Sequence, residues 1–263
     1  HAPFGHKGEK SLKKLAGKYG LTFDHELHSL RVVDVLDSPY LKEFGHPGLN
    51  LTFAVRDGIA CHYGEGFEVS LSPDRNKRPE DLPNTVRGTA RPATLEGCVV
   101  RWADKVAYLG RDLEDAYTLD IVSAGDLPGS VQARLGTTNR QIISALVTEL
   151  VLNSPGGEGG ISIGREMHEA LNDLYQFNMQ HIYQTDEAML HYDQIDRAME
   201  FLFEFLRARL DGAAGDLNKV CSGDKIEEWT LKVFAEFLQK DIRDWQRVRP
   251  ERLALDFIAG MTD

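Results

Sequence analysis

Cysteine is scarce in this chain: its 263 residues include three, Cys61, Cys98 and Cys221. They form no CxxC pair and no even-numbered set, so the sequence predicts neither structural disulfides nor a zinc site. Cysteine used in this way is typical of a reducing compartment. We therefore expect the protein in the cytoplasm.

Long apolar runs are also lacking. The most apolar helical stretch, IISALVTELVL at residues 142–152, is too short to span a bilayer and contains Thr148 and Glu149. No signal peptide is visible, although the chain begins at His1 without a methionine and an upstream segment could precede it. The sequence predicts no membrane partner.

Basic residues are outnumbered by acidic ones. The chain has 30 Lys and Arg against 41 Asp and Glu, which gives a formal net charge of -11. The average electric field of such a protein repels a phosphate backbone, so nucleic acid is not expected as a partner. A small anionic ligand would need a local basic pocket.

Strand patterns are few, and the apolar spacing is helical along nearly the whole chain. In TFDHELHSLRVVDVL one core-facing stripe is formed by Phe23, Leu27, Leu30 and Val33. Similar stripes recur toward the C-terminus. We expect a single all-α domain over residues 1–263, with an irregular Pro-, Gly- and charge-rich loop at 64–94 and a helical C-terminal lobe from about residue 155.

The stretch RWADKVAYLGRDLEDA carries polar residues at helical spacing. Asp104, Tyr108 and Asp112 follow one another at steps of four, which stacks two carboxylates and a phenol along one face of a helix, with Lys105 beside them. Solvated side chains of a surface helix are the simpler interpretation of such spacing. Apolar residues on the flanks of the stripe instead favour a helix buried on more than one side, where a carboxylate needs a cation, a metal or several donors.

The first residues, HAPFGHKGEK, carry a second candidate set. His6 and Glu9 lie three residues apart where a helix is predicted to begin, so an imidazole and a carboxylate share one face, as in a proton-transfer pair. His25 lies on the next predicted helix. Each of these histidines alone is better explained as structural or solvated, but three such groups on consecutive helices favour a site.

Five blocks in order carry a resemblance to a known family. They are HAPFGHKGE, FDHELHSLRVV, GLNLTFAVRDGI, LEGCVVRWADKVAYLGRDLEDA and DFIAGMTD. Together they resemble the HD-superfamily deoxynucleoside triphosphate triphosphohydrolases, the dGTPase group, from the first residue to the last. The resemblance implies an HD-domain helical bundle with additional C-terminal helices. It also implies that the chain is the interior of a longer protein, whose metal-binding HD dyad lies just before His1.

The activity implied by the resemblance is metal-dependent hydrolysis of a deoxynucleoside triphosphate, dGTP or another dNTP, to deoxynucleoside and inorganic triphosphate. His6 is then the catalytic proton-transfer residue and Glu9 its orienting partner. Asp104 is the last ligand of a divalent metal such as Mg or Mn, whose other ligands are expected upstream of residue 1. The substrate-binding residues implied are His1, His25, Lys105, Tyr108 and Asp112. Of these, His25 and Lys105 face the phosphates, and Tyr108 and Asp112 contact the sugar and its 3′-hydroxyl.

The family also implies partners. We expect a dNTP as substrate, a homo-oligomer, and a nucleotide effector, with the loop at 64–94 as a candidate contact or effector element. Two alternatives stay open. One is an HD-type phosphohydrolase acting on another nucleotide, because the scaffold and the metal do not choose the base. The other is a non-catalytic nucleotide-binding regulatory subunit.

Overall fold

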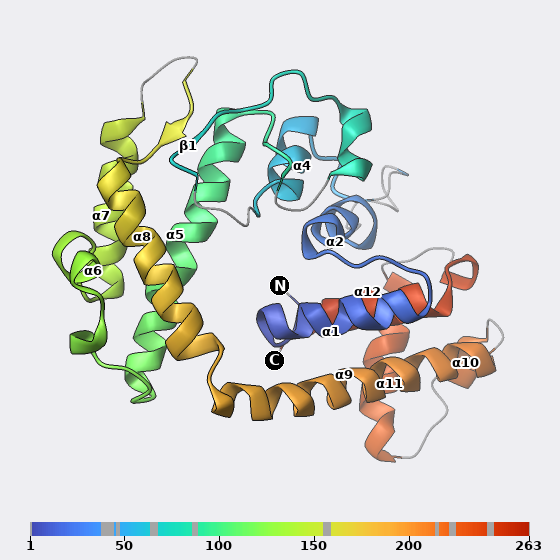
Figure 1. The fold of residues 1–263 in the computed structure, drawn as a ribbon. Coiled ribbons are helices and arrows are strands. Elements are labelled where there is room, and N and C mark those ends of the chain that lie inside the picture. Colours follow the sequence, from blue (N-terminus) through green and yellow to red (C-terminus); the bar gives the residue numbers. More distant parts are fainter. Residues whose placement is uncertain are drawn as a thin grey trace. The chain divides into compact units, whose positions relative to one another are not determined.

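A computed structural model describes residues 2–37, 45, 48–63, 68–85, 89–154, 159–213, 216–220, 225–240 and 245–262. Its α-helices (Figure 1) are α1 (Gly5–Lys18), α2 (His25–Arg31), α4 (Phe53–Ala60), α5 (Leu95–Thr118), α6 (Gly129–Arg134), α7 (Asn139–Asn153), α8 (Arg165–Asn178), α9 (Asp186–Ala213), α10 (Leu217–Val220), α11 (Lys225–Lys240) and α12 (Pro250–Ala259). Two short strands, β1 (Ser70–Leu71) and β2 (Ile161–Ser162), pair antiparallel. The predicted all-α fold class is confirmed.

The helices group into two compact units. Unit 1 combines His1–Leu51 with Leu190–Asp263, and unit 2 is the continuous stretch Thr52–Met189. Unit 1 therefore brings the two ends of the sequence into one core, an arrangement that helix patterns along the chain do not predict. The expectation of one domain over residues 1–263, with a C-terminal lobe from about residue 155, stays a prediction.

The core of unit 1 forms where α1, α9, α11 and α12 meet. Apolar residues at helical spacing on each helix turn inward, among them Leu12, Leu15, Phe203, Leu206, Phe234 and Leu255. Polar contacts add to this packing, since the Lys7 Nζ lies 2.7 Å from Asp196 Oδ2 and the Tyr19 hydroxyl donates to Glu204 Oε1 at 2.6 Å. Helix α1 is thereby held against α9 along most of its length.

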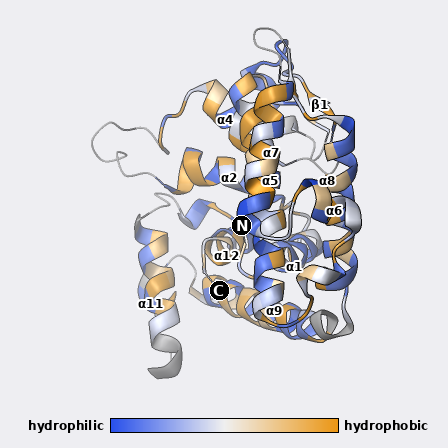
Figure 2. Ribbon diagram, turned by 90° about the vertical axis from the view of Figure 1, so that its left-hand side faces the viewer, coloured by the Kyte–Doolittle hydropathy of each residue, from blue (hydrophilic) through white to orange (hydrophobic). Residues whose placement is uncertain are grey.

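The core of unit 2 is built around α5, which packs against α7 and α8. Its buried apolar residues include Leu109, Leu113, Ile142, Leu146 and Leu174. Thr94 caps the start of α5 by accepting from the Gly97 N–H at 3.1 Å, and the Asn178 Nδ2 of α8 donates to Leu109 O at 3.1 Å. Hydrophobic and hydrophilic residues alternate along single helices (Figure 2), the pattern of helices that bury one face.

The predicted loop at 64–94 is irregular where the structure describes it. Residues 64–67 and 86–88 lie outside the described residues; the rest contains β1 and a 3₁₀-helix at Pro79–Asn84. Leu71 and Leu82 are buried, and the Lys77 Nζ reaches the fully buried Asp57 of α4 at 2.5 Å. This ion pair joins the segment to the body of unit 2.

Among the residues that the structure describes, no helix combines the length and the apolar character needed to cross a membrane. The stretch 142–152 lies within α7, where Ile142 and Leu146 are buried in the core of unit 2.

Candidate functional site

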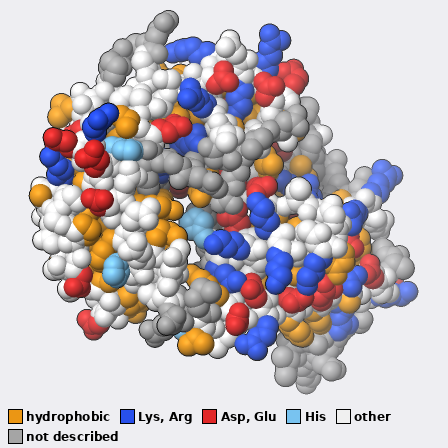
Figure 3. All heavy atoms as spheres, viewed as in Figure 1, with side chains coloured by type: hydrophobic (Ala, Val, Ile, Leu, Met, Phe, Trp, Pro, Cys, Tyr) orange, Lys and Arg blue, Asp and Glu red, His pale blue; other side chains and the backbone are white. Residues whose placement is uncertain are grey.

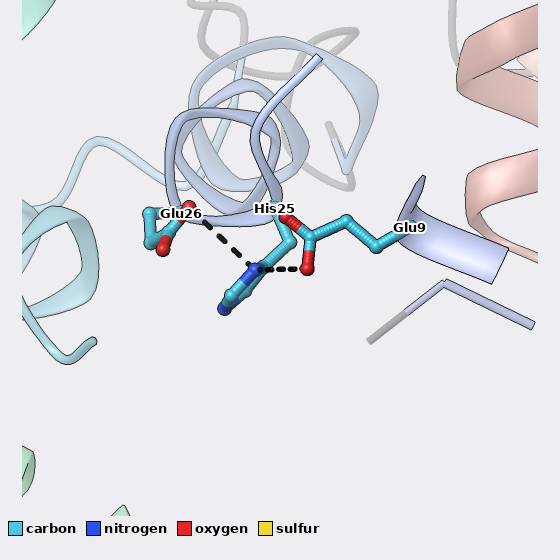
Figure 4. A group of neighbouring side chains, drawn as sticks. All are labelled: Glu9, His25 and Glu26. Atoms are coloured by element: carbon cyan, nitrogen blue, oxygen red, sulfur yellow. Dashed lines mark ion pairs between the residues drawn. The ribbon is translucent and has the colours of Figure 1, made fainter. Parts of the chain in front are cut away.

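A cluster of three ionisable side chains is buried between α1 and α2 of unit 1 (Figure 4). The His25 Nδ1 lies 3.1 Å from Glu9 Oε2 and 3.5 Å from Glu26 Oε2. All three residues are nearly inaccessible, with exposed fractions of 2% for Glu9, 5% for His25 and 3% for Glu26. Both carboxylates therefore meet the same ring nitrogen, and the other ring nitrogen points away from them (Figure 4).

Local structure places these side chains. The turn before α1 packs so tightly on the helix that a Cβ on Gly8 would lie 1.7 Å from Pro3 O, so only glycine fits beside Glu9. His25 opens α2, and Asp24 before it is held by Lys13 of α1 at 2.6 Å. The Lys13–Asp24 ion pair thus adds a second link between the two helices beside the Glu9–His25 contact.

Two kinds of chemistry suit this cluster. A carboxylate on one ring nitrogen fixes the orientation and tautomer of a histidine, which leaves the other nitrogen to exchange a proton with a ligand. Alternatively, the two carboxylate oxygens and the imidazole nitrogen, all within 4.8 Å of one another, could hold a divalent cation. The sequence analysis predicted Glu9 and His25 as site residues but missed Glu26. The adjacent candidate His25 could have indicated Glu26.

The other N-terminal candidates differ in their surroundings. His6 lies three residues before Glu9 on α1, and its side chain is exposed. His1 lies outside the described residues. Glu9 contacts His25 at 3.1 Å, a partner that sequence spacing did not suggest. The roles assigned to these residues stay predictions.

Helix α5 of unit 2 carries the second candidate set. Asp104, Tyr108 and Asp112 are half-buried along one face, while Lys105 is buried. Burial, followed by the charge of Arg101, lowers the pKa of Lys105 to about 8, and burial raises the pKa of Tyr108. Asp112 accepts a short hydrogen bond from the Tyr183 hydroxyl, 71 residues further along the chain, a partner that the sequence did not indicate.

A shallow hollow, with no room for a buried water molecule, lies beside Lys105. Its lining residues are Glu68, Leu71, Arg101, Trp102 and Lys105, all in unit 2. The two cations lie on consecutive turns of α5, and the Lys105 Nζ sits 5.6 Å from the centre of the Trp102 ring. Arg101 and Lys105 make this part of the α5 surface locally basic in an acidic protein, and the role of Lys105 toward phosphates stays a prediction.

The two candidate sets belong to different units. His6, Glu9 and His25 lie in unit 1, whereas Asp104 and the other α5 residues lie in unit 2. Their convergence on one metal-phosphate pocket stays a prediction.

A further buried ionic group ties α2 to α12. Arg31 donates from Nε and Nη2 to the fully buried Asp256 carboxylate at 2.6–2.9 Å, and the His28 Nδ1 lies 3.7 Å from Asp256 Oδ1. Neither ring nitrogen of His28 has a hydrogen-bond partner among the described residues. The sequence predicted His28 as structural or solvated; the structure buries it beside the DFIAGMTD block.

The burial of His28 predicts a loss of stability in acid. Burial, then the charges of Arg31 and Arg252, lower its pKa from 6.5 to about 4. Between these values the unfolded chain binds a proton that the folded chain does not, so stability falls as the pH falls from about 6.5 to about 4. At about 1.4 kcal/mol per pKa unit, the expected loss is about 3 kcal/mol. Urea unfolding at several pH values measures it.

The variant His28→Gln isolates this effect, because glutamine does not titrate. Asp256 and other carboxylates titrate in the same pH range, and burial raises the pKa of Asp256. The contribution of His28 is therefore the difference in unfolding free energy between the parent protein and the variant at each pH. We expect the variant to lose markedly less stability between pH 6.5 and 4.5. Parallel profiles would contradict the assignment to His28.

The basic residues of α1 form one solvated face. Lys10, Lys13, Lys14 and Lys18 are exposed. Figure 3 shows this row of basic side chains, bordered by acidic side chains over α9. Lys18 pairs with Glu200 and Lys7 with Asp196, so part of the charge is compensated within unit 1.

The divalent metal that the family resemblance implies requires several ligands. Asp104 offers a hard oxygen ligand of the kind that Mg²⁺ and Mn²⁺ prefer, but one carboxylate does not define a metal site. Over the described ranges, the one group of three or more clustered ligand side chains is Glu9, His25 and Glu26, in the other unit. Asp104 therefore fits as a single ligand of a site that needs further donors.

Fold and site together define an all-helical protein with a buried histidine–carboxylate cluster and a polar helix face beside a basic hollow. No family model matches the chain. It is 31% identical over its full 263 residues to a deoxyguanosinetriphosphate triphosphohydrolase-like protein of Caldanaerobacter subterraneus subsp. tengcongensis, of which it covers 60%. A protein of the same name from Desulfatibacillum aliphaticivorans is 32% identical over 80% of the chain, which covers 54% of that protein. Another, from Syntrophus aciditrophicus, is 39% identical over 48% of the chain, which covers 28% of that protein.

The chain belongs to the deoxyguanosinetriphosphate triphosphohydrolase-like family. The resemblance noted in the sequence is thereby confirmed. The chain spans 54–60% of the length of the first two relatives.

Proposed function

We propose that the protein hydrolyses a deoxynucleoside triphosphate to deoxynucleoside and inorganic triphosphate, with dGTP or another dNTP as substrate. The observation that carries the proposal is the buried Glu9–His25 contact at 3.1 Å, in a chain similar along its whole length to triphosphohydrolase-like proteins. A buried imidazole oriented by a carboxylate is suited to proton transfer at a phosphate ester.

In this proposal, the unit 1 residues handle protons. Glu9 fixes the ring of His25 through Nδ1, so its other nitrogen faces the phosphates. His6, exposed one turn before Glu9 on α1, gives a proton to the leaving oxygen at the α-phosphate. Glu9 contacts the ring of His25 and, in this proposal, also orients His6, which lies three residues earlier on the same helix.

The α5 residues of unit 2 bind the substrate in this proposal. Lys105 faces the phosphates, while Tyr108 and Asp112 contact the sugar and its 3′-hydroxyl. The short hydrogen bond from Tyr183 holds the Asp112 carboxylate in one orientation, which favours a defined acceptor for a hydroxyl group. Asp104 would be one ligand of a divalent metal, which when bound neutralises phosphate charge and activates water.

Product analysis tests this function. The full-length protein is incubated with Mg²⁺ or Mn²⁺ and each dNTP in turn, and the products are separated by ion-exchange chromatography. We expect deoxynucleoside and intact triphosphate in equal amounts. Release of pyrophosphate or monophosphate would instead indicate an HD-type phosphohydrolase of another specificity. Bound but unchanged nucleotide would indicate a regulatory subunit, and either result would overturn the proposal.

A further inference from the structure

A fully buried asparagine ends α8. Asn178 is the last residue of this helix, and none of its surface is exposed. Its Nδ2 donates to Leu109 O of α5 at 3.1 Å, while its Oδ1 has no hydrogen-bond partner among the described residues. A buried carbonyl oxygen without a donor costs free energy, so an apolar side chain of the same shape would suit packing better. The amide therefore indicates a role beyond packing.

The second partner of the Asn178 side chain is the phenol of Tyr183, five residues further along the chain. The Tyr183 hydroxyl donates its own hydrogen to Asp112 Oδ2, so its oxygen accepts from Asn178. The amide nitrogen carries two hydrogens, which serve Leu109 O and the phenol. A chain of hydrogen bonds thus runs from Asn178 through Tyr183 to the Asp112 carboxylate, all within unit 2.

The backbone between Asn178 and Tyr183 makes their contact possible. Residues five apart on an α-helix lie about 140° from each other around its axis, on different faces. After Asn178 the chain instead forms a π-helix, Met179–Tyr183, where the Gln184 N–H donates to Met179 O at 3.1 Å. The i→i+5 bonding of a π-helix places residues five apart on one face, and such turns are frequent at functional sites. The wider turn therefore brings the Tyr183 phenol to the Asn178 amide.

The chain of hydrogen bonds ends on a carboxylate to which the proposed function assigns the sugar. Asp112 is half-buried on α5, and its carboxylate accepts from a phenol that the Asn178 amide holds in place. The amide is anchored in turn to the backbone of α5 at Leu109 O. A carboxylate has about four lone-pair sites, so it can accept from Tyr183 and from a substrate hydroxyl together. A fixed orientation favours such an acceptor because less freedom is lost on binding.

We propose that Asn178 is a positioning residue for sugar recognition: through Tyr183 it orients the Asp112 carboxylate to accept the 3′-hydroxyl of the nucleotide. The inference rests on the proposed function and deepens it, because it names what makes this carboxylate selective for a sugar with a 3′-hydroxyl. Asn178 itself does not contact the substrate. Its effect must therefore pass through Tyr183 and concern only nucleotides that carry the 3′-hydroxyl.

Calorimetric titration of the full-length protein, in EDTA to prevent turnover, tests the inference apart from catalysis. The two ligands are the dNTP that binds most tightly and its 2′,3′-dideoxy analogue, which lacks only the 3′-hydroxyl. Asn178→Leu keeps the shape of the side chain and removes both N–H donors. It should weaken dNTP binding by about five- to tenfold, because a misaligned carboxylate loses most of a charge-assisted hydrogen bond. Binding of the dideoxy analogue should stay within about twofold.

Two companion variants show whether the effect passes through Tyr183. Tyr183→Phe removes the hydroxyl and should weaken binding of the dNTP, but not of its dideoxy analogue, by about tenfold. When it is combined with Asn178→Leu, the two losses should not add, because both variants break the same chain of hydrogen bonds. Asn172→Leu is the matched control, since Asn172 is a half-buried asparagine of the same helix, and it should change both affinities by less than about twofold.

Circular dichroism and thermal unfolding identify any variant that fails to fold. Asn178→Ser is the second variant, because it removes the same donors with a smaller side chain that adds no apolar group. The inference is overturned if the Asn178 variant weakens both nucleotides equally, as a general loss of structure would, or if it weakens neither. It is also overturned if the parent protein binds the dNTP and its dideoxy analogue equally well.

The proposed function can fail separately. A protein that shows the 3′-hydroxyl-dependent loss in Asn178→Leu but hydrolyses no dNTP would keep the positioning role and lose the function. A protein that releases triphosphate from dNTPs with an unchanged KM in Asn178→Leu and Tyr183→Phe would keep the function and lose the positioning role.

Discussion

Replacing Lys77 with methionine is expected to lower the free energy of unfolding by about 3–5 kcal/mol. The Lys77 Nζ lies 2.5 Å from Oδ1 of Asp57, whose side chain is fully buried in α4. Methionine fills similar space without charge, so the variant leaves the carboxylate buried with no cation. Oδ2 of Asp57 keeps one partner, the Ala93 N–H at 2.5 Å, which does not neutralise it. Urea unfolding followed by circular dichroism measures the loss.

Two further variants test whether the loss of stability comes from the buried Asp57 carboxylate. Arg75→Met removes an exposed positive charge two residues earlier in the same segment and should change stability by less than about 0.5 kcal/mol. Asp57→Asn in the Lys77→Met background removes the buried charge and keeps an oxygen for the Ala93 N–H, so it should recover much of the stability. If Lys77→Met unfolds like the parent protein, the pair does not anchor the 64–94 segment.

Replacing His6 with alanine is expected to lower kcat for dNTP hydrolysis by about 10²–10⁴-fold, the usual contribution of a proton-transfer group. The side chain is exposed on α1, outside the core formed by Leu12 and Leu15, so its removal should leave the fold intact. KM should change little if His6 acts mainly on the leaving oxygen in the transition state. Steady-state kinetics on the most active dNTP measures both constants.

His191→Ala is the matched control for this experiment. His191 is an exposed histidine of α9 in unit 1, and no catalytic role is proposed for it, so its loss should leave kcat and KM unchanged. Turnover by His6→Ala at the parent rate would show that the imidazole is not the proton-transfer residue. The buried pair Glu9–His25 would then be the remaining candidate in unit 1.

Several features of the site could be predicted from local spacing. Asp104, Tyr108 and Asp112 lie on one face of α5 because steps of four residues match the helical period. The N-terminal helix and its candidates, His6 and Glu9, follow from the same rule applied after the PFG turn. Such predictions succeed because helix geometry relates neighbours three and four residues apart without reference to the rest of the chain.

Partners distant in sequence were not predictable in this way. Tyr183 binds Asp112, Arg31 binds Asp256 and Lys77 binds Asp57 across gaps that follow no period. The burial of single side chains was not predictable either. Local sequence does not distinguish Lys105, which is buried, from Lys10, which is exposed to solvent. These outcomes depend on how helices pack, because packing decides which polar groups lose water and must find a partner.

The sequence by itself determined that this protein is helical, that it is acidic, and that its five ordered blocks resemble the triphosphohydrolase family. Hydrophobic periodicity, composition and the order of motifs are all properties of the chain alone. Only the tertiary structure decided that the two ends share one core, that His25 stands between Glu9 and Glu26, and that Arg101, Trp102 and Lys105 surround a hollow. The physical reason is that burial and proximity arise from packing between distant segments, which no local pattern encodes.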